Sequence, residues 1–291
     1  MTDKLKIAVV GGDERQAGLC RLLADDGHKV FAFALERTQL PENVIQERDI
    51  LRLNQKFDCA VLPIPVRSDS EHLNAPLSLH EHTLGDIFSY FTSGQTIIAG
   101  KIDNSLFEKA GRSGMRLYDY LEREDFNVLN SISTAEGAIE VAMKELDFTL
   151  HNKSCLVIGY GHIGKLLCRY LQGLGVKVTA SARKSGDLAW ISAYGYNAIE
   201  TSKIAPALSS FDIIFNTVPK LILDEDALPN IKRDAFICDL ASKPGGVDFN
   251  FAKQLGLHTV HALSLPGKYA PASAAEAMRC TIYNILDEWR N

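Results

Sequence analysis

A glycine turn between a strand-length apolar run and a helical segment is the feature that most constrains the fold of this chain. The run Cys155-Leu156-Val157-Ile158 leads directly into Gly159-x-Gly161-x-x-Gly164, and helical spacing continues through Leu171. In a βαβ unit the first glycine permits the tight turn, the second admits a pyrophosphate close to the backbone, and the third lets the helix pack on the strand. The N-terminus of the helix offers N–H groups to the phosphates. The pattern predicts a Rossmann dinucleotide-binding domain whose site includes Gly159, Tyr160, Gly161, His162, Ile163 and Gly164.

The end of the next expected strand distinguishes NAD from NADP. Enzymes that use NAD usually carry Asp or Glu there, about 20 residues after the glycine turn, to hold the ribose 2′-hydroxyl. Here the chain reads Thr179-Ala180-Ser181-Ala182-Arg183-Lys184-Ser185, without a carboxylate. An arginine can make paired, charge-assisted hydrogen bonds with a 2′-phosphate. The prediction is therefore NADP, bound with the help of Ser181, Arg183 and Lys184, and the alternative is a solvated basic turn.

Strand-length apolar runs alternate with helix-period segments along the whole chain, which is typical of parallel sheets covered by helices. We expect strands at 7–10, 30–35, 59–64, 96–99, 155–158, 177–181, 213–216, 236–239 and 259–262, and helices at 14–26, 107–111, 133–150 and 274–289. In the third of these helices, Ser133 or Thr134 is the expected N-cap, with Glu136 placed to close a capping box.

The length of 291 residues suits two domains of ordinary size. The predicted fold class is α/β, with a flavodoxin-like N-terminal domain at 1–130 and a Rossmann domain at 131–274, both built on parallel sheets. By analogy with other two-domain chains of this kind, the C-terminal helix at 275–291 is expected to pack on the N-terminal domain.

Composition narrows the classes of function. A net charge of -5 gives no electrostatic reason to expect nucleic acid or an anionic membrane as partner. No apolar run approaches the roughly 20 residues that cross a bilayer. The six scattered cysteines lack a C-x-x-C pair, which favours reduced, buried thiols and a cytoplasmic location. The eight histidines show no ligand spacing, so no metal site is predicted.

The N-terminal run from Val9 to Gln16 is a poorer candidate for a dinucleotide site because it lacks the third glycine at the required spacing. It nevertheless follows a strand end, where open α/β sheets bind ligands. Asp13, Arg15 and Gln16 are therefore either substrate-facing residues or, with Asp13 as the cap, the ordinary start of a helix.

The domain layout resembles that of the D-2-hydroxyacid dehydrogenases, with two differences at the expected site. Lys243 stands where those enzymes carry an arginine that binds the substrate carboxylate, and Leu265-Pro266-Gly267-Lys268 lacks the catalytic histidine that follows their proline. Simple oxidation of a hydroxy acid is therefore not expected.

Five sequence blocks in the same order resemble the family of dipicolinate synthase A subunits more closely. They are Gly11-Gly12-Asp13-x-Arg15-Gln16, Asn130-Ser131-Ile132-Ser133-Thr134-Ala135-Glu136-Gly137, Asn216-Thr217-Val218-Pro219, Asp239-Leu240-Ala241-Ser242-Lys243-Pro244-Gly245-Gly246 and Leu265-Pro266-Gly267-x-x-Ala270-Pro271. The resemblance covers essentially the whole chain. His162 departs from it, because an arginine is expected at that position in many relatives.

The resemblance implies oxidation of dihydrodipicolinate to pyridine-2,6-dicarboxylate (dipicolinate) during sporulation, with NADP as acceptor and the B subunit of dipicolinate synthase as partner, in the mother-cell cytoplasm. A homo-oligomer is also expected. Removing a hydride and a proton gives an aromatic ring, so the protein mainly has to position its substrate. Candidate carboxylate clamps are Lys243, Lys268 and Arg15, and Glu136 either removes a proton or completes the helix cap.

Asn216, Thr217, Val218 and Pro219 follow a strand end beside the glycine turn, where such folds line the ribose and nicotinamide of the cofactor; the alternative is a plain strand-terminating turn. Two other functions remain open at this point. One is a different NAD(P)-dependent dehydrogenase of amino or keto acids, and the other is a non-catalytic NADP-binding protein that regulates a partner.

Overall fold

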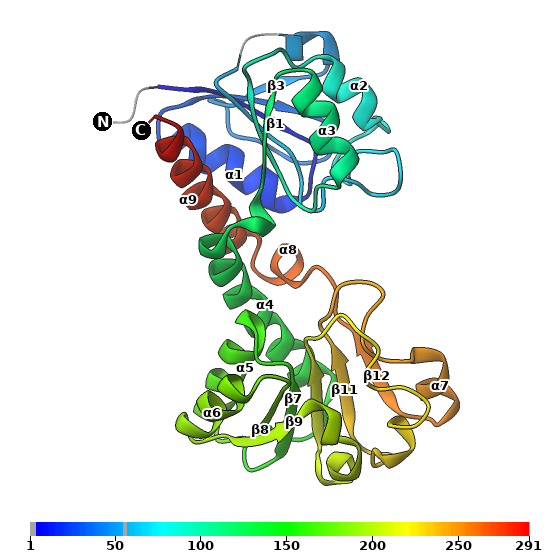
Figure 1. Cartoon of the computed structure of the whole chain (residues 1–291). Helices are drawn as coiled ribbons and strands as arrows, with labels where there is room; N and C mark the ends of the chain where they lie inside the picture. The colour runs from blue at the N-terminus through cyan, green and yellow to red at the C-terminus, as the bar shows by residue number, and fades with distance from the viewer. Residues whose placement is uncertain (1–3, 55–56, 291) are drawn as a thin grey trace. The chain divides into compact units, whose positions relative to one another are not determined.

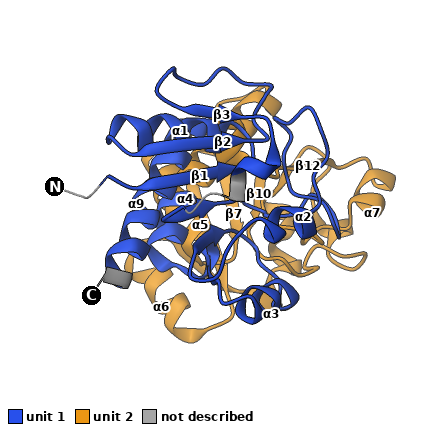
Figure 2. Ribbon diagram, turned by 90° about the horizontal axis from the view of Figure 1, so that it is seen from above, with its two compact units in different colours: residues 1–130, 270–291 blue, residues 131–269 orange. Residues whose placement is uncertain are grey.

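The computed structural model describes residues 4–54 and 57–290 of the chain. It divides into two compact units, coloured separately in Figure 2. Unit 1 comprises residues 1–130 and 270–291, and unit 2 comprises residues 131–269.

Unit 1 is an open parallel sheet with helices on both faces (Figure 1). Its strand order is β3-β2-β1-β4-β5-β6. Without the short edge strand β3, the order β2-β1-β4-β5-β6 is that of flavodoxin-like folds, as the sequence predicted. The elements of this unit are β1 (Lys6–Val10), α1 (Glu14–Asp25), β2 (Lys29–Phe33), β3 (Ile45–Glu47), β4 (Cys59–Val61), α2 (Leu84–Ser89), β5 (Thr96–Ala99), α3 (Asn104–Arg112), β6 (Arg116–Asp119) and α9 (Pro271–Arg290).

Alternating residues of the central strands build two cores in unit 1. Ile7 and Val9 of β1 face one layer, which α1 and α9 cover, whereas Ala8 and Val10 face the layer beneath α2 and α3. Helix α9 packs closely on α1, because a Cβ added to Gly18 would lie 3.1 Å from the Cβ of Ala275. Burial of both faces explains why these strands are continuously apolar in sequence.

Unit 2 is a second parallel sheet, with strand order β12-β11-β10-β7-β8-β9. This is the order of dinucleotide-binding domains, and it reverses between β7 and β10. Its elements are β7 (Ser154–Ile158), α5 (His162–Gly173), β8 (Lys177–Ala182), α6 (Ser185–Ala193), β9 (Asn197–Glu200), β10 (Ile213–Asn216), β11 (Phe236–Asp239), α7 (Phe249–Gln254), β12 (His258–His261) and α8 (Leu265–Tyr269). Helix α4 (Glu124–Glu145) begins in unit 1 and continues into unit 2.

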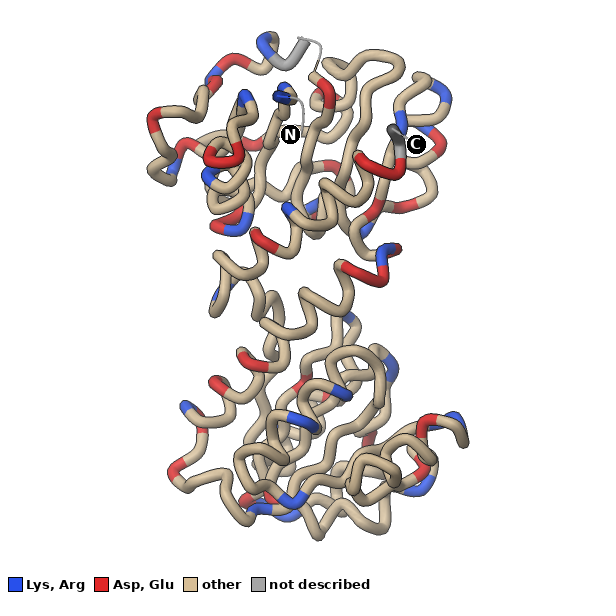
Figure 3. The backbone as a smooth tube through the Cα atoms, turned by 90° about the vertical axis from the view of Figure 1, so that its left-hand side faces the viewer, with Lys and Arg blue, Asp and Glu red and all other residues tan. Residues whose placement is uncertain are grey.

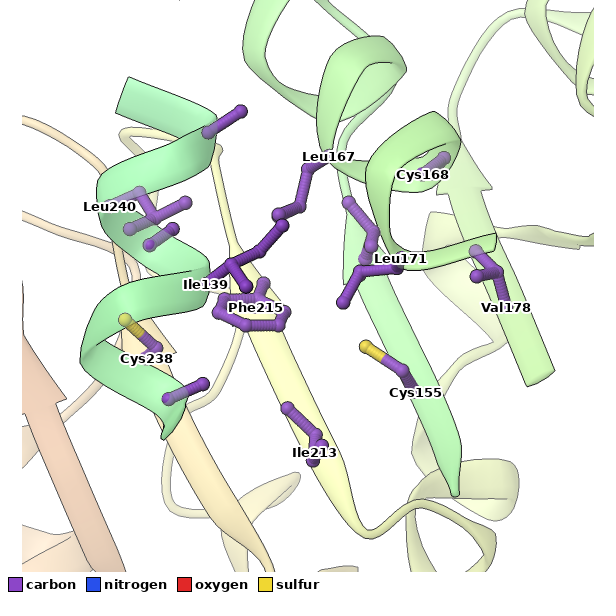
Figure 4. Packing of buried hydrophobic residues seen from close by; sticks show 14 of the residues in the cluster. Ile139, Cys155, Leu167, Cys168, Leu171, Val178, Ile213, Phe215, Cys238 and Leu240 are labelled. Carbon is purple, nitrogen blue, oxygen red and sulfur yellow. The ribbon is translucent and has the colours of Figure 1, made fainter. Parts of the chain in front are cut away.

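One core of unit 2 fixes the helix that follows the glycine turn. Leu167 and Leu171 of α5 point toward the sheet, and Phe215 of β10 lies beside Ile139 of α4 (Figure 4). The opposite core contains Leu156 and other alternate residues of the same strands. Residues of α4, α5, β7 and β10 therefore share one buried core, which positions the carboxyl ends of β7 and β10 at the sheet edge.

The structure corrects two expectations about local elements. Helix α4 begins at Glu124, so Ser133 and Thr134 lie in mid-helix and neither is an N-cap, and Glu136 closes no capping box. The helix continues because residues 124–136 contain neither glycine nor proline, and both hydroxyl side chains are buried against neighbouring elements. Strand β9 was also missed, because it is a four-residue edge strand in which exposed or half-exposed polar residues flank Ala198 and Ile199, so no apolar run marks it.

Both signs of charge are interspersed along the backbone of each unit in the view of Figure 3. Among the described residues, no helix combines the length and the apolarity that crossing a bilayer requires.

Candidate functional site

The candidate site lies at the carboxyl edge of the unit 2 sheet, where β7, β8, β10 and β11 end. Open α/β sheets bind ligands where the strand order reverses, which here is between β7 and β10. Gly159 follows β7, and the loop that starts at Asn216 follows β10. The sequence-predicted glycine turn and the loop 216–219 are therefore neighbours in space.

Each glycine of the turn meets a different steric requirement. Gly159 has φ +99°, and an added Cβ would lie 2.4 Å from Thr217 Oγ1. An added Cβ on Gly164 would lie 2.2 Å from the carbonyl oxygen of Gly159, so the helix can approach the strand only without a side chain there. A Cβ on Gly161 would meet no atom within 4 Å. Packing therefore explains Gly159 and Gly164. Gly161 faces open space, which suits the approach of a ligand.

The N-terminus of α5 carries no cap from a side chain. Gly161 is its N-cap residue and makes no side-chain capping hydrogen bond. The helix spans 12 residues and has no acidic residue in its first turn. A helix start of this kind stabilises a phosphate group through its N–H groups and its dipole.

The other residues of the turn differ in exposure. Tyr160 is buried, which raises the pKa of its phenol to about 12, and Lys165 Nζ lies 5.8 Å from the centre of its ring. His162 is exposed as the first residue of α5, and Ile163 packs partly against the core. Of the side chains at 160, 162 and 163, that of His162 is therefore the one exposed to solvent.

The glycine turn of unit 1 is closed by its own chain. The side chain of Asp13 accepts a hydrogen bond from the backbone N–H of Arg15, and Gln16 Oε1 accepts one from the N–H of Asp13, which completes a capping box on α1. The backbone N–H of Gly12 donates to the carbonyl of Asn74. A Cβ on Gly11 would lie 2.6 Å from Leu73 Cδ2. Segment 73–75 and the capping side chains therefore lie directly against this turn and occupy the start of α1.

Arg15 belongs to the same closed turn. Its guanidinium donates from Nε and Nη2 to the two oxygens of Asp13, at 2.8 Å each, and from Nη2 to the carbonyl of Ile64 at 2.5 Å. Only 8% of its side chain is exposed. This geometry gives Arg15 an internal role that joins the ends of β1 and β4.

The basic end of β8 is open to solvent. Arg183 and Lys184 are exposed, and Lys184 is the N-cap residue of α6 without a side-chain capping hydrogen bond. Ser181, in contrast, is fully buried, and its hydroxyl accepts a hydrogen bond from Thr201 Oγ1 at 3.2 Å. Arg183 and Lys184, at the uncapped start of α6, can contact a phosphate. Ser181 is buried and bonds to Thr201, so it stabilises the end of the strand.

Hydrogen bonds join the loop after β10 to the ends of both neighbouring strands, β7 and β11. Thr217 Oγ1 donates to the carbonyl of Ile158 at 2.9 Å, directly beside the glycine turn. Asn216 is fully buried, and its Nδ2 donates to Asp239 Oδ1 at 2.7 Å. Val218 is half-buried and Pro219 is exposed. Sequence reasoning named Asn216 but missed Asp239, although a polar residue that ends a buried apolar strand was a signal for it.

The remaining predicted residues lie on three further segments of unit 2. Lys243 is exposed on the loop after β11. Lys268 is exposed on α8, which packs on α4 at Gly137, where an added Cβ would lie 3.1 Å from Leu265 Cβ. Glu136 is exposed on α4, one residue before this contact. Within residues 4–54 and 57–290, no group of three or more His, Cys, Asp or Glu could hold a metal ion.

Comparison with known proteins gives matches over both units. Residues 6–121 match the N-terminal domain of the dipicolinate synthase A subunit, and residues 128–243 match the NAD binding domain of D-isomer specific 2-hydroxyacid dehydrogenases. The dipicolinate synthase A subunit of Bacillus subtilis (strain 168) is 30% identical over 290 residues, covering 99% of this chain and 98% of the relative.

Solved structures of the same family are similar over the full length. The dipicolinate synthase A subunit from Bacillus halodurans is 29% identical, with a TM-score of 0.89 and 97% of each chain covered. The A chain of dipicolinate synthase from Bacillus subtilis is 30% identical, with a TM-score of 0.88, 99% of this chain covered and 97% of that chain. The predicted family resemblance and fold class are confirmed, and unit 2 is a nicotinamide dinucleotide-binding domain of the dehydrogenase kind.

Proposed function

Because the chain belongs to the family of dipicolinate synthase A subunits, we propose that it oxidises dihydrodipicolinate to dipicolinate with NADP as the hydride acceptor. The observation that carries the proposal is the start of α5, where an uncapped helix N-terminus meets a glycine whose Cβ would contact nothing. This arrangement suits a pyrophosphate. It also contrasts with the closed turn of unit 1, so the dinucleotide belongs to unit 2.

The choice of NADP rests on the end of β8. Arg183 and Lys184 are both exposed, and α6 starts there without a side-chain cap. An Asp or Glu at this position would repel a 2′-phosphate, whereas a guanidinium can bind it with two parallel hydrogen bonds. The basic pair therefore favours NADP over NAD.

The reaction balances as a two-electron oxidation. Dihydrodipicolinate loses a hydride and a proton, and the ring becomes aromatic. When bound, the dinucleotide supplies the hydride acceptor. The protein has to hold the substrate ring in a fixed orientation and to receive the proton, which is chiefly a positioning task.

Two lysines and one glutamate of unit 2 are assigned to the substrate. Lys243 and Lys268 are exposed at or beyond the carboxyl ends of β11 and β12, and each ammonium can pair with a substrate carboxylate. Glu136 closes no capping box and is exposed on α4, which makes it the candidate proton acceptor. Arg15 is not assigned to the substrate, because its guanidinium already makes two hydrogen bonds with the carboxylate of Asp13.

The relatives are named as the A subunit or the A chain of dipicolinate synthase, and we propose that this chain acts together with the B subunit of that enzyme. The experiment that tests the function is an aromatisation assay. Freshly generated dihydrodipicolinate and NADP are mixed with the purified chain, with and without the B subunit, and dipicolinate is followed by its absorbance. Formation of one NADPH per dipicolinate supports the proposal. NADPH binding without turnover in either mixture supports a regulatory role instead.

A matched control addresses other amino and keto acids. The same chain is tested with a set of amino, keto and hydroxy acids under identical conditions. Turnover of one of these, with none of dihydrodipicolinate, would contradict the proposed substrate.

A further inference from the structure

A buried amide–carboxylate pair joins the two ligand-facing loops of unit 2. Asn216 ends β10 and Asp239 ends the neighbouring β11, at opposite positions in the parallel ladder. Both side chains are fully buried, and Asn216 Nδ2 donates to Asp239 Oδ1 at 2.7 Å. The pair therefore sits directly beneath the loops that leave these strands.

The Asp239 carboxylate organises the loop that carries Lys243. Its Oδ2 accepts from the backbone N–H of Gly246 at 2.8 Å, and its Oδ1 also accepts from the N–H of Ala241 at 3.1 Å. These two bonds hold the first and last residues of loop 241–246. Gly246 has no room for a side chain, because an added Cβ would lie 2.2 Å from Asn216 Nδ2.

Asn216 organises the other loop. Its Nδ2 also donates to the carbonyl of Val218 at 3.0 Å, and its Oδ1 accepts from the N–H of Val218 at 3.2 Å. Thr217, between them, bonds to the carbonyl of Ile158 and stands against Gly159. A continuous chain of hydrogen bonds and contacts thus links the glycine turn, loop 216–219 and loop 241–246.

Burying the Asp239 carboxylate costs free energy, because the group loses its hydration. Among the described residues, no Lys, Arg or His nitrogen makes a salt bridge with Asp239, and its side chain is fully buried. A buried carboxylate without a cation loses its hydration, so hydrogen bonds must offset the cost. Asn216 Nδ2 and the backbone N–H groups of Ala241 and Gly246 donate these hydrogen bonds. All three form together only when both loops have the arrangement seen here, so they stabilise that arrangement.

We propose that Asp239 is a positioning residue that, through Asn216, holds the nicotinamide-side loop 216–219 and the Lys243 loop in a single arrangement. The proposal rests on the proposed function, since that assigns the cofactor to the first loop and the substrate carboxylate to Lys243. Asp239 itself touches neither ligand. We expect its effect to be largest on the nicotinamide half of the cofactor and on the substrate, because the printed bonds of Asp239 go to Asn216, Ala241 and Gly246 and none goes to the glycine turn or the end of β8.

The test compares a whole cofactor with a fragment in the full-length Asp239→Asn variant. Dissociation constants are measured by calorimetry for NADPH and for 2′,5′-ADP, which lacks the nicotinamide half. We expect the constant for NADPH to rise about tenfold, near the lower end of the effect of losing one hydrogen bond to a charged group. The constant for 2′,5′-ADP should change less than about twofold. Asp248→Asn is the matched control, because Asp248 caps α7 in the same unit and should alter neither constant.

The outcomes separate positioning from general damage. Equal weakening of NADPH and 2′,5′-ADP would mean that the variant disturbs the whole unit, and unchanged NADPH binding would mean that the pair positions nothing; either result overturns the proposal. If the unaltered chain binds neither ligand, the proposed cofactor fails and this inference fails with it. If the chain binds NADPH but forms no dipicolinate, the proposed reaction fails. The binding test still decides whether Asp239 positions the two loops.

A reciprocal exchange covers the case in which Asp239→Asn folds poorly. Asn216→Asp places two carboxylates side by side and should weaken NADPH binding further than tenfold. Adding Asp239→Asn restores an amide–carboxylate bond between the strands, so the double variant should regain part of the lost affinity. A double variant that bound NADPH no more tightly than Asn216→Asp alone would overturn a direct coupling.

Discussion

The hydroxyl of Thr217 lies 2.4 Å from the position that a Cβ atom on Gly159 would occupy. This close approach, together with φ +99° at Gly159, means that only glycine fits at the first position of the turn. The loop after β10 and the turn after β7 therefore hold each other in place, so changes in either are expected to affect ligand binding.

Substitutions at the first and second glycines separate packing from ligand approach. We expect Gly159→Ala to lower the free energy of unfolding by about 1–3 kcal/mol, because it adds backbone strain and a steric clash. Gly161→Ala should preserve stability, since its Cβ meets nothing within 4 Å, but should weaken NADPH binding by blocking the pyrophosphate. Urea unfolding and NADPH fluorescence measure the two effects. Normal NADPH affinity in Gly161→Ala would contradict the site.

Arg183→Ala tests the 2′-phosphate contact. We expect the affinity for NADPH to fall by about 1.5–3 kcal/mol while the affinity for NADH is unchanged, because only NADPH carries the phosphate. Fluorescence titration with both cofactors measures the difference. Lys177→Ala provides a control, since Lys177 is an exposed cation at the opposite end of the same strand. An equal loss for both cofactors would contradict the assignment of NADP.

Lys243→Met tests the carboxylate clamp. Removing the ammonium should raise KM for dihydrodipicolinate at least tenfold and leave the dissociation constant of NADPH unchanged, because an ionic hydrogen bond contributes about 1.5–3 kcal/mol. Steady-state kinetics at saturating NADP provide the measurement. Lys253→Met is the control, as Lys253 is exposed on α7. A change in kcat with unaltered KM would place Lys243 outside substrate binding.

Arg15→Ala distinguishes an internal role from a substrate contact. The substitution leaves Asp13 without its bidentate partner at a site where only 8% of the arginine side chain is exposed. We expect a loss of about 3 kcal/mol in the free energy of unfolding, near the lower end for broken buried pairs because Asp13 is partly exposed. Thermal denaturation checks this. A stable variant with a raised KM would restore Arg15 to the substrate site.

A histidine–aspartate pair should make the loop over the unit 1 turn pH-dependent. Backbone N–H groups of Glu71 and His72, and then the His72 ring, lower the pKa of Asp69 to about 2, and the bond to Asp69 raises the pKa of His72 above 6.5. The Asp69 contribution to loop stability is therefore present above pH 3.8 and is lost as the pH falls toward 2. The His72 contribution is complete below pH 6.5 and is lost as the pH rises through its raised pKa.

Proton NMR titration of the histidine rings measures this effect. The midpoint of His72 should lie above 6.5 and move down in Asp69→Asn. His82 is an internal reference in the same spectrum, because its burial lowers its pKa below 6.5 by a cause independent of Asp69. If Asp69→Asn left the His72 midpoint in place, the two side chains would not be paired in solution.

The sheets could be predicted from sequence because their strands are buried on both faces and are therefore continuously apolar. The strand at 96–99 coincides with β5, and that at 213–216 with β10. The strands β3, β6 and β9, each at an edge of its sheet, were not among the expected strands, because their exposed residues interrupt the apolar pattern. The edge strand β12 was expected at 259–262. The expected domain limits at 130/131 and 274/275 compare with unit limits at 130/131 and 269/270.

The glycine turn was visible in sequence because its steric requirements involve residues a few positions apart. The roles of Arg15 and Asp239 depend instead on which side chains meet across strands. Arg15 was expected either to face substrate or to belong to an ordinary helix start, and Asp13 and the carbonyl of Ile64 occupy its donors. Asp239 meets Asn216 across 23 positions of sequence, a distance at which local patterns carry no information on pairing.

The capping box that closes the Gly11-Gly12 turn has a consequence for stoichiometry. The chain contains two doubly wound sheets, and each has a glycine turn after its first strand, yet only the second leaves its helix start open. A titration of this protein with NADPH is therefore expected to saturate at one equivalent per chain. In the first sheet the corresponding helix start is already occupied by the side chains of Asp13 and Gln16.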